Sequence, residues 1–198
     1  PSLRISAATL HRILIYIKRG LTRRHGTDLL VSPESNLNLI LIGRDISTPR
    51  PELGKPFGSY SLPMTYAKGD ESNHDSVLRT LQQEVAASLT LNRKLPQNLV
   101  PKNPRVNLTI DIADVRVKTY RLIIPDDIIE ELDSYKLSDL TFIPLEQVGE
   151  KSSLDSNFRA GVPEIAQAYL EIGDKSLATP PHYDSLLNRS LALLPAYA

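Results

Sequence analysis

Apolar residues fall into short runs along the chain, several of which alternate with polar residues in the period of two that is typical of β-strands. Runs at 28–31 and 37–42 flank residues 32–36, whose proline, serine and asparagine favour a turn. These two runs are therefore predicted to form a hairpin. Further strands are predicted at 60–63, 106–112, 115–124 and 140–144, and the run at 140–144 is expected to be the last strand along the chain.

A helix is predicted to begin after Ser72. Ser72 and Asp75 have the spacing of a capping box, in which the hydroxyl and the carboxylate satisfy the free amides of the first turn. Apolar residues then recur at the helical period on one side: Val77, Leu78, Leu81 and Val85. Three polar residues share another side: Thr80, Gln83 and Glu84. One face is predicted to pack, leaving the other free for function.

Other helical patterns lie near both ends of the chain. Apolar residues at helical spacing between Leu10 and Leu21 predict an amphipathic helix, although alternating isoleucines at 13, 15 and 17 also permit a short strand. A short acidic helix is predicted at 126–132, and closing helices at 163–172 and 183–194. Mixed strands and helices in 198 residues predict one α/β (α+β) sandwich with a single core.

Composition excludes several classes of protein. The chain is 41% hydrophobic and has no cysteine, which excludes disulfides, thiolate nucleophiles and cysteine-based metal sites. No apolar run approaches the roughly 18 residues of a membrane span. Residues 1–26 hold six basic and no acidic residues, so the remaining 17 basic and 23 acidic residues give the body a net charge of −6. That sign argues against nucleic acid as the main ligand, because such binding depends on clustered lysine and arginine.

The charge asymmetry divides the chain into a basic amphipathic segment, 1–26, and a domain, 27–198, that includes the closing helices. Three interpretations of the segment stay open: a helix packed on the domain with a solvated cationic face, an organelle-targeting segment, or a helix lying on anionic lipid. The first is compatible with a cytoplasmic protein and the second with a mitochondrial one. The segment is also a candidate surface for a protein partner.

Residues 65–87 resemble the Nudix box of the MutT-like superfamily. That motif places a glycine, five residues, a glutamate, seven residues, and then Arg-Glu-aliphatic-any-Glu-Glu-any-Gly. Glu71, Arg79, Leu81 and Glu84 match it in identity and spacing. The stretches 39–44 and 140–148 also look like the family's flanking strands. The resemblance implies a Nudix-like α/β/α sandwich with a mixed sheet, here with extra N- and C-terminal helices.

The chain departs from the motif at the residues that carry its chemistry. In the family, three glutamates on one helix face bind Mg²⁺ or Mn²⁺ ions that grip a diphosphate, and two of these positions are Thr80 and Gln83 here. Mg²⁺ depends on carboxylate oxygens, so its binding is expected to be greatly weakened. Thr65 replaces the motif's glycine, and the loop before the helix is expected to be reshaped.

The resemblance implies a reduced set of catalytic and metal-binding residues. Glu84 and Glu71 would hold the metal, and Glu130 or Glu131 would serve as the general base. The alternative for the acidic stretch 126–131 is a solvated helix N-terminus, where the helix dipole stabilises acids.

Substrate-binding residues are predicted at Arg44, Tyr60 and Arg79. The alternatives are that Arg79 orients Glu84 by an ion pair and that Tyr60 packs in the core. Substrate specificity is expected to come from the proline-rich loops at 45–58 and 94–107, because loops around the box set specificity in this family.

Two functions stay open. In the first, the protein has an incomplete metal site and binds a nucleotide or organic diphosphate with absent or weak hydrolysis, or acts as a scaffold, without a cofactor. In the second, it is an active, atypical Nudix hydrolase that cleaves a nucleoside-diphosphate-linked or other organic diphosphate with Mg²⁺ or Mn²⁺. The two missing carboxylates favour the first function.

Overall fold

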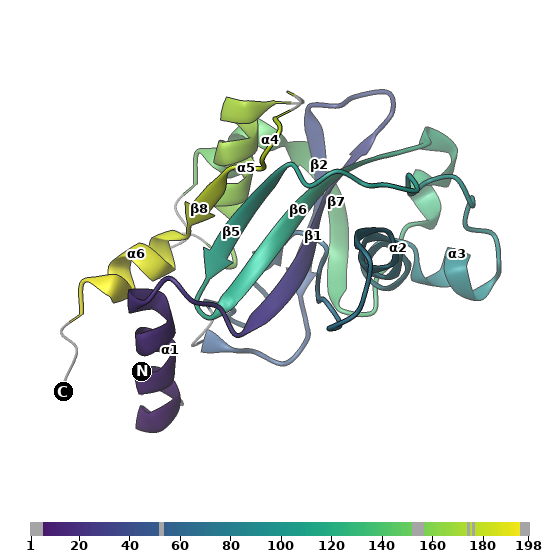
Figure 1. Cartoon of the computed structure of the whole chain (residues 1–198). Helices are drawn as coiled ribbons and strands as arrows, with labels where there is room; N and C mark the ends of the chain where they lie inside the picture. The colour runs from purple at the N-terminus through teal and green to yellow at the C-terminus, as the bar shows by residue number, and fades with distance from the viewer. Residues whose placement is uncertain (1–5, 52–53, 152–156, 174, 176, 195–198) are drawn as a thin grey trace.

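Two β-sheets pack on each other at the centre of the molecule (Figure 1). The computed structural model describes residues 6–51, 54–151, 157–173, 175 and 177–194. The larger sheet has the order β4 (Met64–Tyr66), β1 (Arg24–Pro33), β6 (Val115–Ile124), β5 (Leu108–Ile112) and β8 (His182–Asp184). The smaller sheet has the order β3 (Tyr60–Ser61), β2 (Leu39–Asp45) and β7 (Leu137–Pro144).

Helices cover both sides of the paired sheets and extend the fold at its termini, which confirms the predicted α/β sandwich (Figure 1). On one side lie α2 (Asn73–Glu84), α3 (Ala87–Leu91) and the 3₁₀ helix η2 (Asp126–Glu131). On the other side lie α4 (Leu145–Gly149) and α5 (Val162–Ile172), and near the chain ends lie α1 (Ala7–Lys18) and α6 (Leu186–Ala192). One apolar cluster fills the space between the sheets and α5, and a second lies under α2.

The predicted hairpin between the first two strands is wrong. The chain does turn after Pro33, but β1 and β2 lie in different sheets. β1 is buried continuously from Gly26 to Pro33 and pairs with β6 in parallel and with β4 antiparallel. A strand buried on both faces occupies the centre of a sheet and has two neighbours. The turn residues therefore fix where the chain reverses, and not which strands pair.

α2 has the predicted start. The Ser72 hydroxyl accepts a hydrogen bond from the Asp75 amide at 3.1 Å and donates to the Asp75 carboxylate at 2.7 Å. The prediction of a free polar face is wrong, because Thr80 and Glu84 are 0% and 1% exposed. A second layer covers that face: Thr65 of β4 contacts Thr80, and the segment 133–136 hydrogen-bonds the end of the helix.

The C-terminal region contains a strand that the sequence pattern did not predict. Residues 182–184 form β8, which pairs with β5 in parallel, so the strand at 137–144 is not the last strand of the chain. The predicted helix at 183–194 is correspondingly shorter and begins at Leu186, with Ser185 as its N-cap. Alternation over three residues is too short to distinguish from a helix start, and only the pairing with β5 defines this strand.

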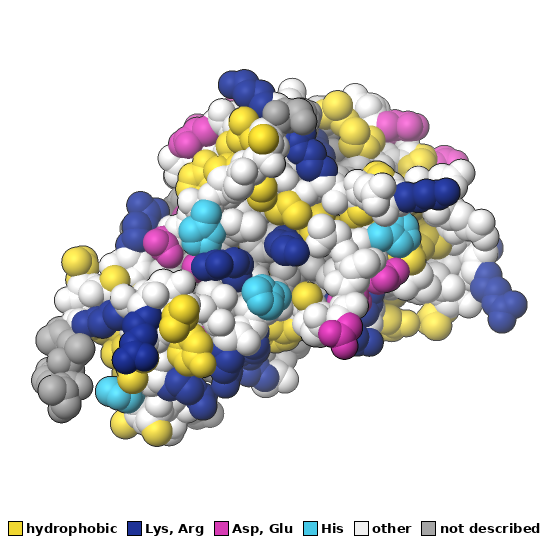
Figure 2. All heavy atoms as spheres, in the orientation of Figure 1, with side chains coloured by type: hydrophobic (Ala, Val, Ile, Leu, Met, Phe, Trp, Pro, Cys, Tyr) yellow, Lys and Arg dark blue, Asp and Glu magenta, His cyan; other side chains and the backbone are white. Residues whose placement is uncertain are grey.

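Residues 7–18 of the basic N-terminal segment form a helix, α1, which packs on the domain through one edge. Ile13 is buried against Ala113, and Leu187 and Leu191 of α6 pack beside it. Lysine and arginine side chains gather over α1 on the face shown in Figure 2. Within the described residues, no helix is both long enough and apolar enough to cross a bilayer.

Candidate ligand-binding site

A cavity of about 240 Å³ opens between the two sheets beside the C-terminal end of α2. Its apolar wall includes Leu62, Met64, Val115 and Val117, which come from β6 and from the segment around β3 and β4. Its polar wall includes Asp45, Ser47, Lys55, Glu84, Lys136 and Arg159. One wall therefore suits an organic group and the other a charged one.

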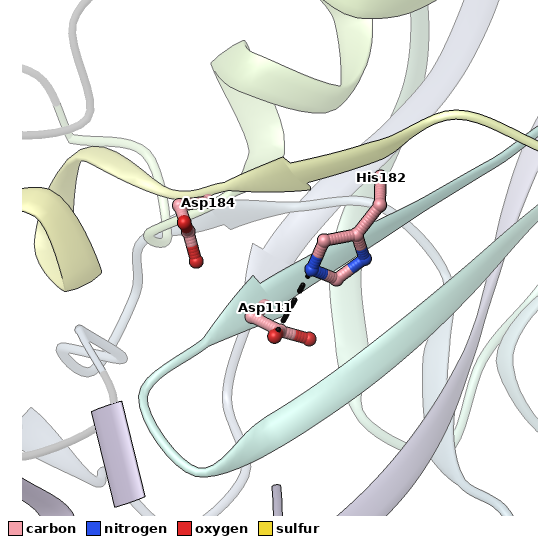
Figure 3. Close-up of side chains that lie close together, drawn as sticks. All are labelled: Asp111, His182 and Asp184. Carbon is pink, nitrogen blue, oxygen red and sulfur yellow. Dashed lines mark ion pairs between the residues drawn. The ribbon is translucent and has the colours of Figure 1, made fainter. Parts of the chain in front are cut away.

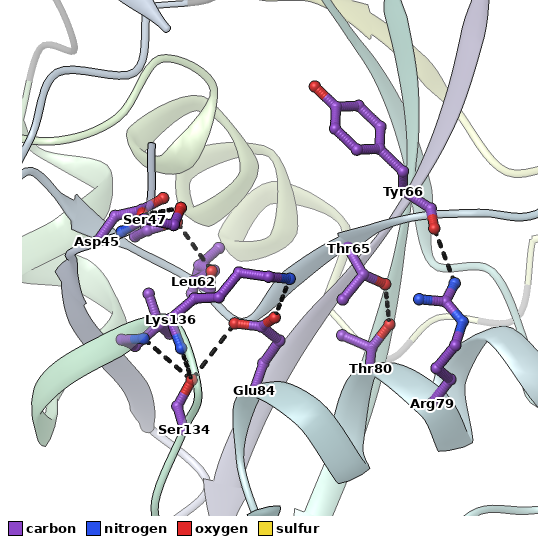
Figure 4. A network of polar contacts seen from close by, with 12 residues as sticks. Asp45, Ser47, Leu62, Thr65, Tyr66, Arg79, Thr80, Glu84, Ser134 and Lys136 are labelled. Carbon is purple, nitrogen blue, oxygen red and sulfur yellow. Dashed lines mark hydrogen bonds and ion pairs between the residues drawn. The ribbon is translucent and has the colours of Figure 1, made fainter. Parts of the chain in front are cut away.

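Glu84 is the buried carboxylate of this wall and is bound to a lysine. The Lys136 ammonium donates to Glu84 Oε1 at 2.5 Å, and the Ser134 hydroxyl lies 3.3 Å from the other carboxylate oxygen (Figure 4). Burial raises the pKa of Glu84, and the contacts with Lys136 and Ser134 oppose this shift. The Lys136 side chain lines the cavity and remains 41% exposed.

Asp45 holds two further cations in the same wall. Its carboxylate lies 3.2 Å from the Lys55 ammonium and 3.7 Å from the Arg159 guanidinium. Asp45 also accepts a hydrogen bond from the Ser47 hydroxyl at 2.6 Å (Figure 4). Lys55 donates to that hydroxyl at 2.5 Å. Burial lowers the pKa of Lys55, and the positive charges of Arg159 and Lys136 lower it further. The three cations are thus close enough to repel one another.

The start of α2 carries a second ion pair, outside the cavity lining. Arg79 donates to both carboxylate oxygens of Glu71, at 2.6 and 2.7 Å, and to the Tyr66 carbonyl at 2.8 Å. The hydrogen bonds that Arg79 donates to the carboxylate lower the pKa of Glu71 to about 2. A bidentate arginine–carboxylate pair is strong and fixed in geometry, so Glu71 is anchored to the helix.

Thr80 lies between these two pairs along α2 and is fully buried. Its hydroxyl donates to the Ser76 carbonyl at 2.8 Å and lies 2.6 Å from the Thr65 hydroxyl of β4 (Figure 4). This contact joins the helix to the edge strand. The site that Thr80 occupies is therefore closed to a ligand.

Asp28 is buried in the interior next to the cavity. It lies two residues along β1 from Gly26, which lines the cavity, and on the same face of the strand. Both of its carboxylate oxygens lack a hydrogen bond of normal geometry within the described residues. Burial raises its pKa to about 8, against smaller opposing effects of Thr119 and Arg159. Asp28 is thus mostly protonated at neutral pH and adds little negative charge.

A second cluster of titratable residues lies at the β8 edge of the larger sheet (Figure 3). Asp111, His182 and Asp184 each offer one metal-ligating atom within 4.8 Å of the others, and His182 Nε2 lies 3.2 Å from Asp111. Arg116, however, donates to both oxygens of Asp111 at 2.9 and 2.8 Å. The buried member of the cluster is thereby neutralised without a metal.

No protein-family model and no curated protein matches the sequence. Solved structures do match: the MutT protein from Methanosarcina mazei Go1 shares 16% identity at a TM-score of 0.52, over 78% of this chain and 98% of that one. The NUDIX domain of Shewanella oneidensis NrtR, complexed with ADP ribose, shares 15% at 0.51, over 84% and 98%. A bifunctional NMN adenylyltransferase/ADP ribose pyrophosphatase from Francisella tularensis, complexed with AMP and a manganese ion, shares 15% at 0.50, over 82% and 47%. The protein has the Nudix fold.

Within this Nudix fold, one carboxylate of the residues that resemble the box lines the cavity, and it is ion-paired. They run from β4 through α2, and the three positions that would carry carboxylates are Thr80, Gln83 and Glu84. Thr80 is buried in hydrogen bonds, Gln83 is an amide, and Glu84 already binds Lys136. A divalent metal at this position would have to replace the Lys136 ammonium on Glu84.

Of the other predicted site residues, Arg44 and Tyr60 lie together outside the cavity lining of the Nudix fold. The Arg44 guanidinium lies 4.4 Å from the centre of the Tyr60 ring and donates to its hydroxyl at 2.9 Å. Neighbouring residues of a strand point to opposite faces, so Asp45 enters the cavity while Arg44 faces away. Glu130 and Glu131 are exposed on η2 and do not line the cavity.

Sequence reasoning missed Asp45, Lys55, Lys136 and Arg159 as residues of the site. Lys55 does lie in the 45–58 loop, from which specificity was expected. The other cations come from the start of β7 and from the segment before α5, far from the box in sequence. No local pattern marks them, because only the folding of the two sheets brings them beside Glu84.

Proposed function

We propose that this protein binds a nucleotide or another organic diphosphate in the cavity, with hydrolysis that is absent or weak. The observation that carries the proposal is the Glu84–Lys136 pair inside a cavity with a cationic wall. Glu84 is the one carboxylate retained from the family's helix face, and its negative charge is neutralised by Lys136. The same wall is suited to the negative charge of a phosphorylated ligand.

The composition of the cavity supports an organic phosphate over a simple ion. Ligand sites combine an apolar lining with a few placed polar groups. Val115 and Val117 offer an apolar surface, while Lys55 and Arg159 offer charge. The Nudix-fold neighbour with ADP ribose bound provides a precedent for this class of ligand in the fold.

The alternative is an active, atypical Nudix hydrolase, with Glu71 and Glu84 as a reduced metal-binding pair. The neighbour with AMP and manganese bound favours testing it. Against it stands the ion pairing of both carboxylates, Glu71 with Arg79 and Glu84 with Lys136. A metal would have to displace an arginine or a lysine from each. A scaffold role, with residues 1–26 as the partner surface, is a further alternative.

Binding and hydrolysis of one ligand panel separate these functions. The panel contains nucleoside di- and triphosphates, dinucleotide polyphosphates, ADP-ribose and prenyl diphosphates, each tested with Mg²⁺ and with Mn²⁺. We expect saturable binding of at least one member, with turnover at background level. Turnover that Glu84→Gln abolishes would instead establish a hydrolase, and Glu130→Gln and Glu131→Gln would then identify its base. Absence of both binding and turnover would overturn the ligand-binding proposal in favour of a scaffold.

A further inference from the structure

The polar wall of the cavity has more positive than negative charge. Among the described residues that line it are four cationic side chains, Arg50, Lys55, Lys136 and Arg159, and two carboxylates, Asp45 and Glu84. The buried Asp28 nearby is mostly protonated at neutral pH, so it does not restore the balance. An excess of two positive charges in a partly enclosed site attracts an anion, because the low dielectric strengthens the interaction.

The contacts in the wall leave the cations incompletely neutralised. Asp45 is shared between Lys55 and Arg159, and the second of these contacts is long, at 3.7 Å. Lys136 uses its ammonium on Glu84, but an ammonium has three donors, and this side chain is 41% exposed. A phosphate oxygen can therefore approach without breaking the Glu84 pair. It would also relieve the mutual repulsion of the three cations.

We propose that Lys55, Lys136 and Arg159 bind a phosphate group directly, so that the ligand is held without a divalent metal. Lys136 sits on the carboxylate that a metal would use, and its ammonium supplies the charge that the metal would otherwise provide. The inference rests on the proposed function, because it concerns the same cavity, and it adds the binding residues and the independence from metal.

The size of the cavity bounds the ligand class. Sites for small molecules usually enclose about 300 to 1,000 Å³, whereas this cavity holds about 240 Å³. The enclosed part of the ligand is therefore a phosphate or diphosphate with a compact apolar group against Val115 and Val117. Any larger portion of the ligand lies outside the opening.

Direct binding by lysine and binding through a metal predict opposite effects for two substitutions. If Lys136 binds the phosphate, Lys136→Met weakens binding, while Glu84→Gln frees the ammonium and leaves binding unchanged or tighter. If a metal bridges Glu84 and the phosphate, Glu84→Gln weakens binding, while Lys136→Met frees Glu84 for the metal and strengthens it. The directions in which the two substitutions change the affinity therefore distinguish direct binding by lysine from binding through a metal.

The experiment is calorimetric titration of the full chain with inorganic pyrophosphate, in low-salt buffer, with EDTA and separately with Mg²⁺. We expect binding in EDTA, weakened roughly tenfold to hundredfold by Lys136→Met, as for loss of a hydrogen bond between charged groups. The matched control is Lys118→Met, a lysine outside the cavity lining, which should leave binding unchanged. Lys136→Gln, which keeps a donor near Glu84, serves if the Met variant fails to fold.

The results bear separately on the two proposals. Binding that appears only with Mg²⁺ and is lost in Glu84→Gln would overturn direct binding by lysine, while ligand binding in the cavity would stand. Equal loss in Lys118→Met and Lys136→Met would mean general charge attraction and would also overturn it. Failure of pyrophosphate and of every member of the organic panel, with and without metal, would overturn both.

Discussion

At the scale of single residues, the Glu84–Lys136 pair joins the buried carboxylate of α2 to a cation of the same chain. A helix face with three carboxylates needs cations to offset their repulsion, and a metal can supply them. With Thr80 and Gln83 in two of those positions, one carboxylate remains, and a single ammonium is enough to neutralise it. The lysine is covalently part of the chain, so the charge is present at any metal concentration.

Asp28 gives a prediction about stability and pH. Its pKa is about 8 in the folded protein and 3.8 ordinarily, so between these values the folded state holds a proton that the unfolded state releases. Stability therefore falls as the pH rises from about 4 to 8. Asp28→Asn removes this penalty, which has an upper bound of about 4 kcal/mol at pH 7 at 1.36 kcal/mol per pKa unit.

The measurement for Asp28→Asn is urea unfolding at several pH values. We expect the variant to gain little at pH 3, where the aspartic acid is mostly protonated in both states, and progressively more up to pH 8. A gain that is equal at all pH values would contradict the assigned protonation.

At the scale of elements, α2 is the part of the structure that local sequence determines best. Its capping box, apolar side and boundaries are all visible in residues 72–85, because a helix cap and a helical period depend only on near neighbours. Strands were also predicted at 115–124, as observed, and at 37–42, where β2 spans 39–45, since long apolar alternation marks a strand wherever it pairs. The pairing of the strands was not predicted correctly. The hairpin of the first two strands was wrong, and β8 was missed.

The cap of α2 can be tested alone. Ser72→Ala removes the side chain that accepts from the Asp75 amide, and loss of such a cap costs about 1 kcal/mol. For a domain of this size, we expect the melting temperature to fall by roughly 2 to 4 °C. Ser72→Thr keeps a capping hydroxyl and should recover most of the loss. A fall of the same size in both variants would show that the cap hydrogen bond is not the cause.

At the scale of the whole molecule, the site is assembled from segments that are far apart in the chain. Asp45 ends β2, Glu84 ends α2, Lys136 precedes β7, and Arg159 precedes α5. The resemblance to the Nudix box predicted the fold, because the motif is contiguous. The cations could not be predicted, since their proximity depends on how the two sheets pack, which no local pattern records.

Deletion of the N-terminal helix tests whether α1 is needed for the core to fold. Neither of the two large apolar clusters contains a described residue of α1, whose buried contact is Ile13 against Ala113 and α6. Deletion of residues 1–19 should therefore leave a cooperatively folding domain. Loss of one buried isoleucine, at about 2 to 3 kcal/mol, lowers the melting temperature by roughly 4 to 12 °C.

Thermal unfolding followed by circular dichroism measures this effect, with Ile13→Ala and Ile15→Ala as a matched pair on the same helix. Ile13 is 3% exposed and Ile15 is 37% exposed, so the first substitution should reproduce much of the loss and the second little of it. Pyrophosphate binding should survive the deletion, because no residue of α1 lines the cavity. A deletion that abolished the cooperative transition would mean that α1 is an integral part of the fold, since the contacts of Ile13 alone are too few to have that effect.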